Sequence, residues 1–152
     1  MTSEQSPPAV VTPTGFGHVR LTVTDIARSK AFYEQLFGAT PDADFSDQID
    51  DPDIKSDPQR LYGGCVFAVG DVMLGLRPVA DDDDTFRSNR VGLDHVSFKV
   101  ASPDEIHAAA RALDAAGIHH GDVSELTEFG MVILSVQDPD DINLELSADL
   151  DD

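Results

Sequence analysis

Basic residues and cysteine are scarce in this chain of 152 residues, and long apolar runs are missing. Ten Lys and Arg stand against 29 Asp and Glu, a formal net charge of −19. Nucleic acids and anionic membranes are therefore excluded as expected partners, because they carry charge of the same sign. No apolar stretch reaches the ~18 residues that a membrane span needs, and residues 1–14 lack the basic and apolar regions of a signal peptide. These absences predict a cytoplasmic protein.

The single cysteine, Cys65, excludes an intrachain disulfide framework. It lies in an apolar run, which favours a buried structural thiol over a nucleophile. A chain of this length can bury one real core but is too short for two independent domains. We therefore expect one domain whose stability comes from apolar packing.

One pattern of elements occurs twice along the chain. Residues 17–23 and 93–100 alternate apolar and polar side chains, which is the period of a half-buried strand. Each strand is followed by a helix signal. In the first half Thr24 or Asp25 can cap a helix over 26–37, and Gly38 suits its end. In the second half a helix is predicted over 103–116.

The second helix has the clearer boundaries. Ser102 suits the cap position, Pro103 the first helical position and Glu105 the capping-box position, while Gly117 ends the pattern. Each helix is followed by a predicted hairpin, and each half has one further, less distinct strand. The hairpins occupy 65–77 and 131–146, and the weaker strands lie near 41–46 and 119–125.

Each half thus reads β-α-β-β-β, and we predict an α+β fold in which two βαβββ repeats form a curved mixed sheet around a cleft. A period of about 77 residues is too long for a solenoid and indicates a duplicated domain. The predicted limits are a flexible arm at 1–14, a domain at 15–148 with repeats at about 15–80 and 91–148, and an acidic tail at 149–152. Residues 47–60 are predicted to be an inserted loop and 81–90 a linker.

Strand parity predicts which side chains face the cleft. Because side chains alternate across a strand, the apolar residues pack under the helices and leave His18, His95 and Glu145 on the opposite face. A lone histidine on a strand is usually structural. Two histidines at equivalent positions of a duplication, with a glutamate on the same face, instead match the facial set of two imidazoles and one carboxylate that holds a divalent metal. We predict these three residues as metal ligands.

Further polar side chains share these faces and are candidate substrate-binding residues. The three cations among them either pair with nearby acids or attract an anionic substrate, and the sequence leaves both interpretations open. The candidates are Arg20, Thr22, Arg77, Ser97, Lys99 and Asn143.

Four segments carry a resemblance to the vicinal oxygen chelate superfamily, which includes glyoxalase I, extradiol dioxygenases, fosfomycin-resistance transferases and bleomycin-resistance proteins. The segments are 17–19, 29–38, 93–96 and the Asp-Pro-Asp run at 138–140 that leads to 144–146. The resemblance covers residues 15–148. It implies a metal-dependent enzyme, of lyase, isomerase, dioxygenase or thiol-transferase type, that acts on a small oxygenated anionic molecule.

The resemblance also assigns roles. It implies His18, His95 and Glu145 as ligands and Glu145 as the catalytic group, with Gly75 where glyoxalase I has a fourth ligand. Three protein ligands favour Fe(II) or Mn(II), with Zn(II) or Ni(II) as alternatives. A homodimer is expected, with the site formed within one chain or between two. The alternative function is a non-catalytic binding protein of bleomycin-resistance type.

Overall fold

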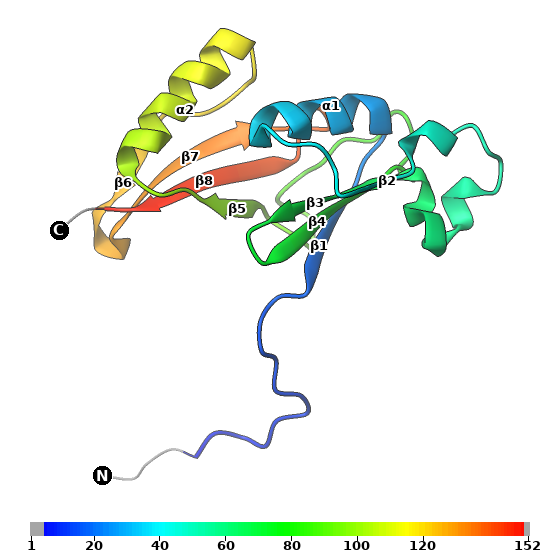
Figure 1. Ribbon diagram of the computed structural model, residues 1–152. Helices are drawn as coiled ribbons and strands as arrows, with labels where there is room; N and C mark the ends of the chain where they lie inside the picture. Colours follow the sequence, from blue (N-terminus) through cyan, green and yellow to red (C-terminus); the bar gives the residue numbers. More distant parts are fainter. Residues whose placement is uncertain (1–4, 151–152) are drawn as a thin grey trace.

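The computed structural model describes residues 5–150 and contains two four-stranded mixed sheets, one from each half of the chain (Figure 1). The strand order is β1-β4-β3-β2 in the first sheet and β5-β8-β7-β6 in the second. In each sheet, the strand that comes first in the sequence pairs in parallel with the one that comes last, β1 with β4 and β5 with β8, and the other pairs are antiparallel. The strands are β1 (His18–Thr22), β2 (Ala43–Asp44), β3 (Cys65–Val69), β4 (Val72–Arg77), β5 (Val96–Lys99), β6 (Ser124–Leu126), β7 (Met131–Gln137) and β8 (Asn143–Asp149).

The two helices begin and end where their capping residues predict. Helix α1 (Ile26–Phe37) starts after Asp25, whose carboxylate accepts a hydrogen bond from the Arg28 amide at 3.1 Å. It ends at Gly38, which has a left-handed φ of 62° that a glycine adopts without strain. Helix α2 (Pro103–Ala116) starts after Ser102 and ends at Gly117 in the same conformation.

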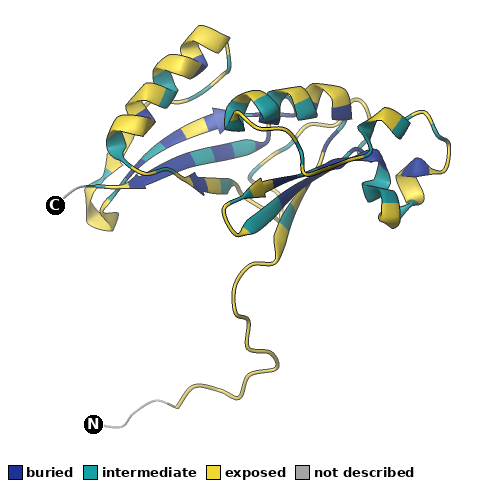
Figure 2. Cartoon of the chain, in the orientation of Figure 1, coloured by how far each residue is buried: buried dark blue, intermediate teal, exposed yellow. Residues whose placement is uncertain are grey.

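Both helices lie on the same side of the sheets (Figure 1). The strand residues beneath them are buried, whereas the outer turns of the helices are exposed (Figure 2). One apolar cluster extends through both halves and includes the fully buried Tyr33, Phe67, Leu76, Leu134 and Leu144. The polar side chains of the strands therefore face away from the helices, as strand parity predicts.

Helix α1 joins the two halves. Its Tyr33 hydroxyl donates to Asp138 of the second half at 2.7 Å, and its Phe37 ring packs edge-on against Phe98 of β5, with centroids 5.2 Å apart. Asp140 accepts a hydrogen bond from the backbone N–H of Thr24 at 2.9 Å. The Asp-Pro-Asp turn thus acts as a clamp between the repeats.

The segment 47–60 is more ordered than a loop insertion. It contributes to three short 3₁₀ turns (Ser46–Gln48, Ile54–Ser56 and Pro58–Gly63), and Ile54 is fully buried. Arg60 fixes it through ion pairs with Asp51 at 2.8 Å and Asp57 at 2.7 Å. The burial predicted for Cys65 is confirmed, and desolvation raises the pKa of its thiol to about 12.

The chain ends differ in part from the predicted limits. Strand β8 continues through Asp149, and Leu150 packs against the core, so the second half extends into the segment predicted to be a tail. The parts of the predicted arm and tail at 1–4 and 151–152 lie outside the described residues. Within residues 5–150, neither helix combines the length and the apolar character needed to cross a bilayer.

Candidate functional site

Two of the three predicted metal ligands lie together on the polar face of the second sheet. His95 directly precedes β5, and Glu145 lies on the neighbouring parallel strand β8, opposite Ser97 in register. The histidine Nε2 is 3.7 Å from the Glu145 Oε2. Both side chains remain accessible, with 43% of the His95 side chain and 18% of the Glu145 side chain exposed, so a ligand can approach them.

The imidazole is held by a residue that the sequence did not single out. The Nδ1 of His95 lies 2.7 Å from a carboxylate oxygen of Asp94. A carboxylate can only accept, so Nδ1 carries a proton, and the other ring nitrogen, Nε2, is the one that faces Glu145. A carboxylate behind the imidazole is the arrangement that orients histidine ligands in metal sites. The signal was available, since Asp94 adjoins His95 in sequence.

The glutamate is positioned by hydroxyl groups. Ser97 Oγ lies 3.0 Å from Glu145 Oε1 and 3.0 Å from Ser147 Oγ. Because Ser97 has one hydroxyl proton and the carboxylate can only accept, Ser97 donates to Glu145 and accepts from Ser147. Ser97, a predicted substrate-binding residue, is thus engaged with the glutamate.

The third predicted ligand lies on the other sheet. His18 is the first residue of β1 and is exposed. Its position is equivalent to that of His95 in the second sheet. Two residues after His18, Arg20 pairs in register with Gly75; two residues after His95, Ser97 pairs in the same way with Glu145. Across residues 5–150, no three His, Cys, Asp or Glu side chains converge with a geometry suited to a metal ion. One copy of the chain therefore brings His95 and Glu145 together but not His18.

Two predicted substrate-binding cations meet on the first sheet. The guanidinium carbon of Arg77 lies 3.7 Å from the centre of the Tyr62 ring, and that of Arg20 lies 5.7 Å from it. The Nε of Arg77 is buried and has no hydrogen-bond partner. Tyr62 reaches this position because Leu61 and Tyr62 both adopt left-handed φ angles of 51° and 57°. Such angles typically strain a non-glycine residue by roughly 1–3 kcal/mol.

The remaining candidates have polar partners or lie free on the surface. Lys99 pairs with Asp149 at 3.0 Å, but both side chains are largely exposed and such pairs contribute little. The Asn143 amide lies against that of Gln137. Thr22 is exposed on β1, opposite Arg77 in register.

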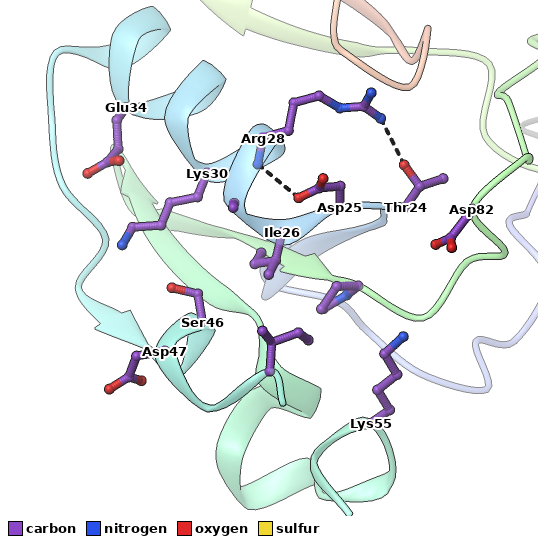
Figure 3. A pocket seen from close by; sticks show the side chains of 13 residues that line it. Thr24, Asp25, Ile26, Arg28, Lys30, Glu34, Ser46, Asp47, Lys55 and Asp82 are labelled. Atoms are coloured by element: carbon purple, nitrogen blue, oxygen red, sulfur yellow. Dashed lines mark hydrogen bonds between the residues drawn. The ribbon is translucent and has the colours of Figure 1, made fainter. Parts of the chain in front are cut away.

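Two of the hollows in the described part of the chain bear on where the site lies. One of about 550 Å³ lies between β4 and β5 and includes His95, Ser97 and Lys99 within a mostly apolar lining. Another of about 630 Å³ lies at the start of α1, where side chains of both charges, including Lys30, Lys55 and Asp47, surround it (Figure 3). No predicted site residue lines this second hollow, so we place the candidate site on the polar sheet faces.

Solved structures share this architecture. A glyoxalase/dioxygenase from Nostoc punctiforme matches 96% of this chain and 100% of its own with a TM-score of 0.69 at 19% identity. A glyoxylase/bleomycin resistance protein/dioxygenase domain from Frankia sp. EAN1pec aligns with a TM-score of 0.62 at 24% identity, and the match covers 91% of this chain and 93% of the Frankia chain. A variant of the fosfomycin resistance protein FosX from Listeria monocytogenes, complexed with Mn(II) and 1S,2S-dihydroxypropylphosphonic acid, matches 91% and 94% with a TM-score of 0.67 at 16% identity.

The sequence comparisons give the family. No curated protein matches the chain. The family model described as Glyoxalase/Bleomycin resistance protein/Dioxygenase superfamily matches residues 15–146, which include both repeats. The predicted resemblance and the predicted glyoxalase-like α+β fold are thereby confirmed. The chain belongs to the Glyoxalase/Bleomycin resistance protein/Dioxygenase superfamily.

Proposed function

We propose that the protein is a metal-dependent enzyme that binds a small, oxygenated, anionic substrate through two neighbouring oxygens on a divalent ion. The proposed ligands are His18, His95 and Glu145. The observation that carries the proposal is the pair formed by His95 and Glu145. An imidazole with its proton directed at Asp94 and a carboxylate oriented by Ser97 face each other at 3.7 Å.

The donor chemistry fits a cation. With Nδ1 protonated and Nε2 free of its proton, as metal binding requires, the facing atoms of His95 and Glu145 are both lone-pair donors, and no hydrogen bond joins them directly. Two imidazoles and one carboxylate suit Fe(II) or Mn(II), with Zn(II) or Ni(II) as alternatives. The similar FosX structure contains Mn(II) together with a vicinal diol phosphonate, which agrees with this choice.

We propose that His18 enters the site from a second copy of the chain. β1 begins at His18, and β5 begins directly after His95. Both are edge strands with a free hydrogen-bonding edge. The segments that lead into them expose Phe16, Val91 and Leu93, with 84%, 110% and 46% of their surface accessible. Free edges flanked by apolar side chains are typical of surfaces covered by association. Each site of the homodimer would then be formed by the first half of one chain and the second half of the other.

The chemistry follows from the charges that the site supplies. When bound, the metal ion would act as a Lewis acid that stabilises negative charge developing on the substrate oxygens. Glu145 lies where it can serve as a ligand and exchange a proton with a bound substrate. Arg20 and Arg77 lie on the first sheet, where they supply positive charge for an anionic group.

The test is metal uptake by protein purified without a histidine tag. We expect the native protein to retain or take up Mn(II), and His95→Ala or Glu145→Gln to weaken binding by about tenfold or more. His107→Ala is the matched control, because this exposed histidine of α2 is remote from the site. Native protein that fails to take up any of the four metals would overturn the proposal.

Mixing variants tests the shared site. His18→Ala and Glu145→Ala should each lose metal alone, whereas hybrid dimers recover one intact site, because each chain supplies the ligand that the other lacks. Absence of recovery in demonstrated hybrid dimers would refute a site shared between copies. A panel of α-keto aldehydes with thiols, catechols and fosfomycin then tests turnover, and binding without turnover would favour a sequestering protein.

A further inference from the structure

The first sheet carries two arginines that lie against the same ring and pair with no acid. Among the described residues, neither Arg20 nor Arg77 has a carboxylate oxygen within ion-pair distance. Both guanidinium groups approach Tyr62, at 5.7 and 3.7 Å from its centre. The chain has ten Lys and Arg, and four of the other eight pair with carboxylates, namely Arg28, Lys30, Arg60 and Lys99.

This arrangement is electrostatically incomplete. Two neighbouring guanidinium groups repel each other, and the aromatic face only partly offsets that repulsion. The buried Nε of Arg77 also lacks an acceptor, which is unfavourable for a charged donor. An oxyanion bound between the two guanidinium groups would relieve their repulsion. A guanidinium stacked on a ring keeps its N–H edge free, and that edge matches carboxylate and phosphate oxygens.

The surrounding backbone is arranged around the same three side chains. The left-handed conformations of Leu61 and Tyr62 bring the ring over Arg77. Beneath Arg20, Gly75 leaves the space that the arginine occupies, since a Cβ there would lie 3.3 Å from the Arg20 Nε. A Cβ at Gly75 would therefore require the Arg20 side chain to shift by a few tenths of an ångström.

We propose that Arg20, Arg77 and Tyr62 form a seat for the carboxylate or phosphoryl group of the substrate, separate from the metal ligands. The two arginines donate to the anion, and the ring holds Arg77 in place. Arg20 follows His18 by two residues on the same strand face, a spacing of roughly 6–7 Å. The substrate class is then a small molecule whose vicinal oxygens and anionic group are separated by a comparable distance. This spacing argument rests on the proposed metal site, whereas the seat itself does not.

The direct test uses metal-free protein and small oxyanions. Chelator-treated wild-type protein is titrated with inorganic phosphate and with acetate at low ionic strength, and binding is followed by NMR chemical shifts. We expect Arg20→Gln and Arg77→Gln each to weaken binding by about tenfold or more, as for a lost hydrogen bond to a charged group. Stronger binding of phosphate would assign a phosphoryl group, and stronger binding of acetate a carboxylate.

Arg111→Gln is the matched control, because it removes the same charge from an exposed position of α2. The seat is refuted if neither anion binds the wild-type protein, or if Arg111→Gln weakens binding as much as the other two variants.

Gly75→Glu provides a second, independent variant if Arg77→Gln does not fold. Its carboxylate would be built beside Arg20 and should occupy the seat from within, so added phosphate should no longer bind. Unchanged phosphate binding by folded Gly75→Glu protein would overturn the proposal. Mn(II) uptake is measured on the same samples. In the wild-type protein, absence of metal binding with intact anion binding refutes the proposed function, and absence of anion binding with intact metal binding refutes the seat.

Discussion

Replacement of Asp138 tests the clamp between the two halves. This carboxylate is only 5% exposed. It accepts hydrogen bonds from the Tyr33 hydroxyl at 2.7 Å and from the backbone N–H groups of Asp140 and Ile142 at 2.8 Å each. Asp138→Ala would leave three buried donors without an acceptor. At 1–3 kcal/mol per unsatisfied donor, we expect a loss of about 3–9 kcal/mol.

Such a loss approaches the roughly 5–15 kcal/mol that stabilises a whole domain. Asp138→Asn should behave very differently. Its amide oxygen can still accept from both backbone N–H groups, and the Tyr33 hydroxyl can turn to accept from the amide nitrogen. We expect this variant to lie within about 1 kcal/mol of the wild type at neutral pH. Tyr33→Phe, which removes one donor, should cost about 1–2 kcal/mol.

The pH dependence separates the charge of Asp138 from its hydrogen bonds. Burial raises the pKa of Asp138 above 3.8, and this effect exceeds the opposing influence of the hydrogen bonds from Tyr33 and the backbone. The folded protein therefore binds this proton more tightly than the unfolded chain. The contribution of Asp138 to stability is full below pH 3.8 and is lost as the pH rises through the raised pKa.

The asparagine variant lacks this dependence. The free energy of unfolding of Asp138→Asn minus that of the wild type should consequently increase as the pH rises from about 3.8 toward neutrality. Urea denaturation at a series of pH values, followed by circular dichroism, measures this difference. A difference that decreases with rising pH would refute the reasoning, because the hydrogen bonds would then outweigh burial and the pKa would be lowered.

Three further predictions concern single sites. His120 directs both ring nitrogens at acceptors, Asp114 and a backbone carbonyl, which raises its pKa above 6.5. The stabilisation by His120 relative to His120→Gln should therefore be full below pH 6.5 and disappear as the pH rises through the raised pKa. Melting temperatures measured over a pH series check this. Asp114→Asn should weaken the pH dependence of the difference in melting temperature. Gly64→Ala would place a Cβ 1.8 Å from a carbonyl oxygen of β4, so we expect the free energy of unfolding to fall by about 3 kcal/mol in denaturant titrations. Gly17→Ala is the control and should change it little, because no atom lies within 4 Å of a Cβ at that position. Asp94→Asn should weaken Mn(II) binding by about 10–100-fold without unfolding the protein, and unchanged affinity in a calorimetric titration would contradict its orienting role.

The fold was accessible from the sequence because its determinants are local. Alternation in residues 17–23 and 93–100 identified the buried faces of β1 and β5, and the caps at Asp25 and Ser102 identified both helix starts. These signals depend on neighbours a few residues apart. The burial of Ile54 inside the predicted loop depends on how the 3₁₀ turns pack on one another, and no periodicity in that segment indicates it.

The candidate site was only partly accessible for the same reason. Parity correctly put His95 and Glu145 on one face, and the parallel register then brought them together. Tyr62 could not be placed, because its position depends on two left-handed residues whose conformation is not typical of their types. The proposed partner of His18 would depend on how the edge strands are covered, which is a property of an assembly and not of a local pattern.

The duplication explains how one fold could acquire a site with two ends of opposite charge. At equivalent positions, the second sheet has Ser97 beside Glu145, and the first has Arg20 beside Gly75. In the proposed site, a short hydroxyl that donates to a carboxylate would give a cation-binding half, and a long cation lying over a glycine would give an anion-binding half. A glutamate at Gly75 would neutralise Arg20 and restore symmetry between the halves. The glycine is therefore better understood as the residue that keeps the first half positive than as a lost metal ligand.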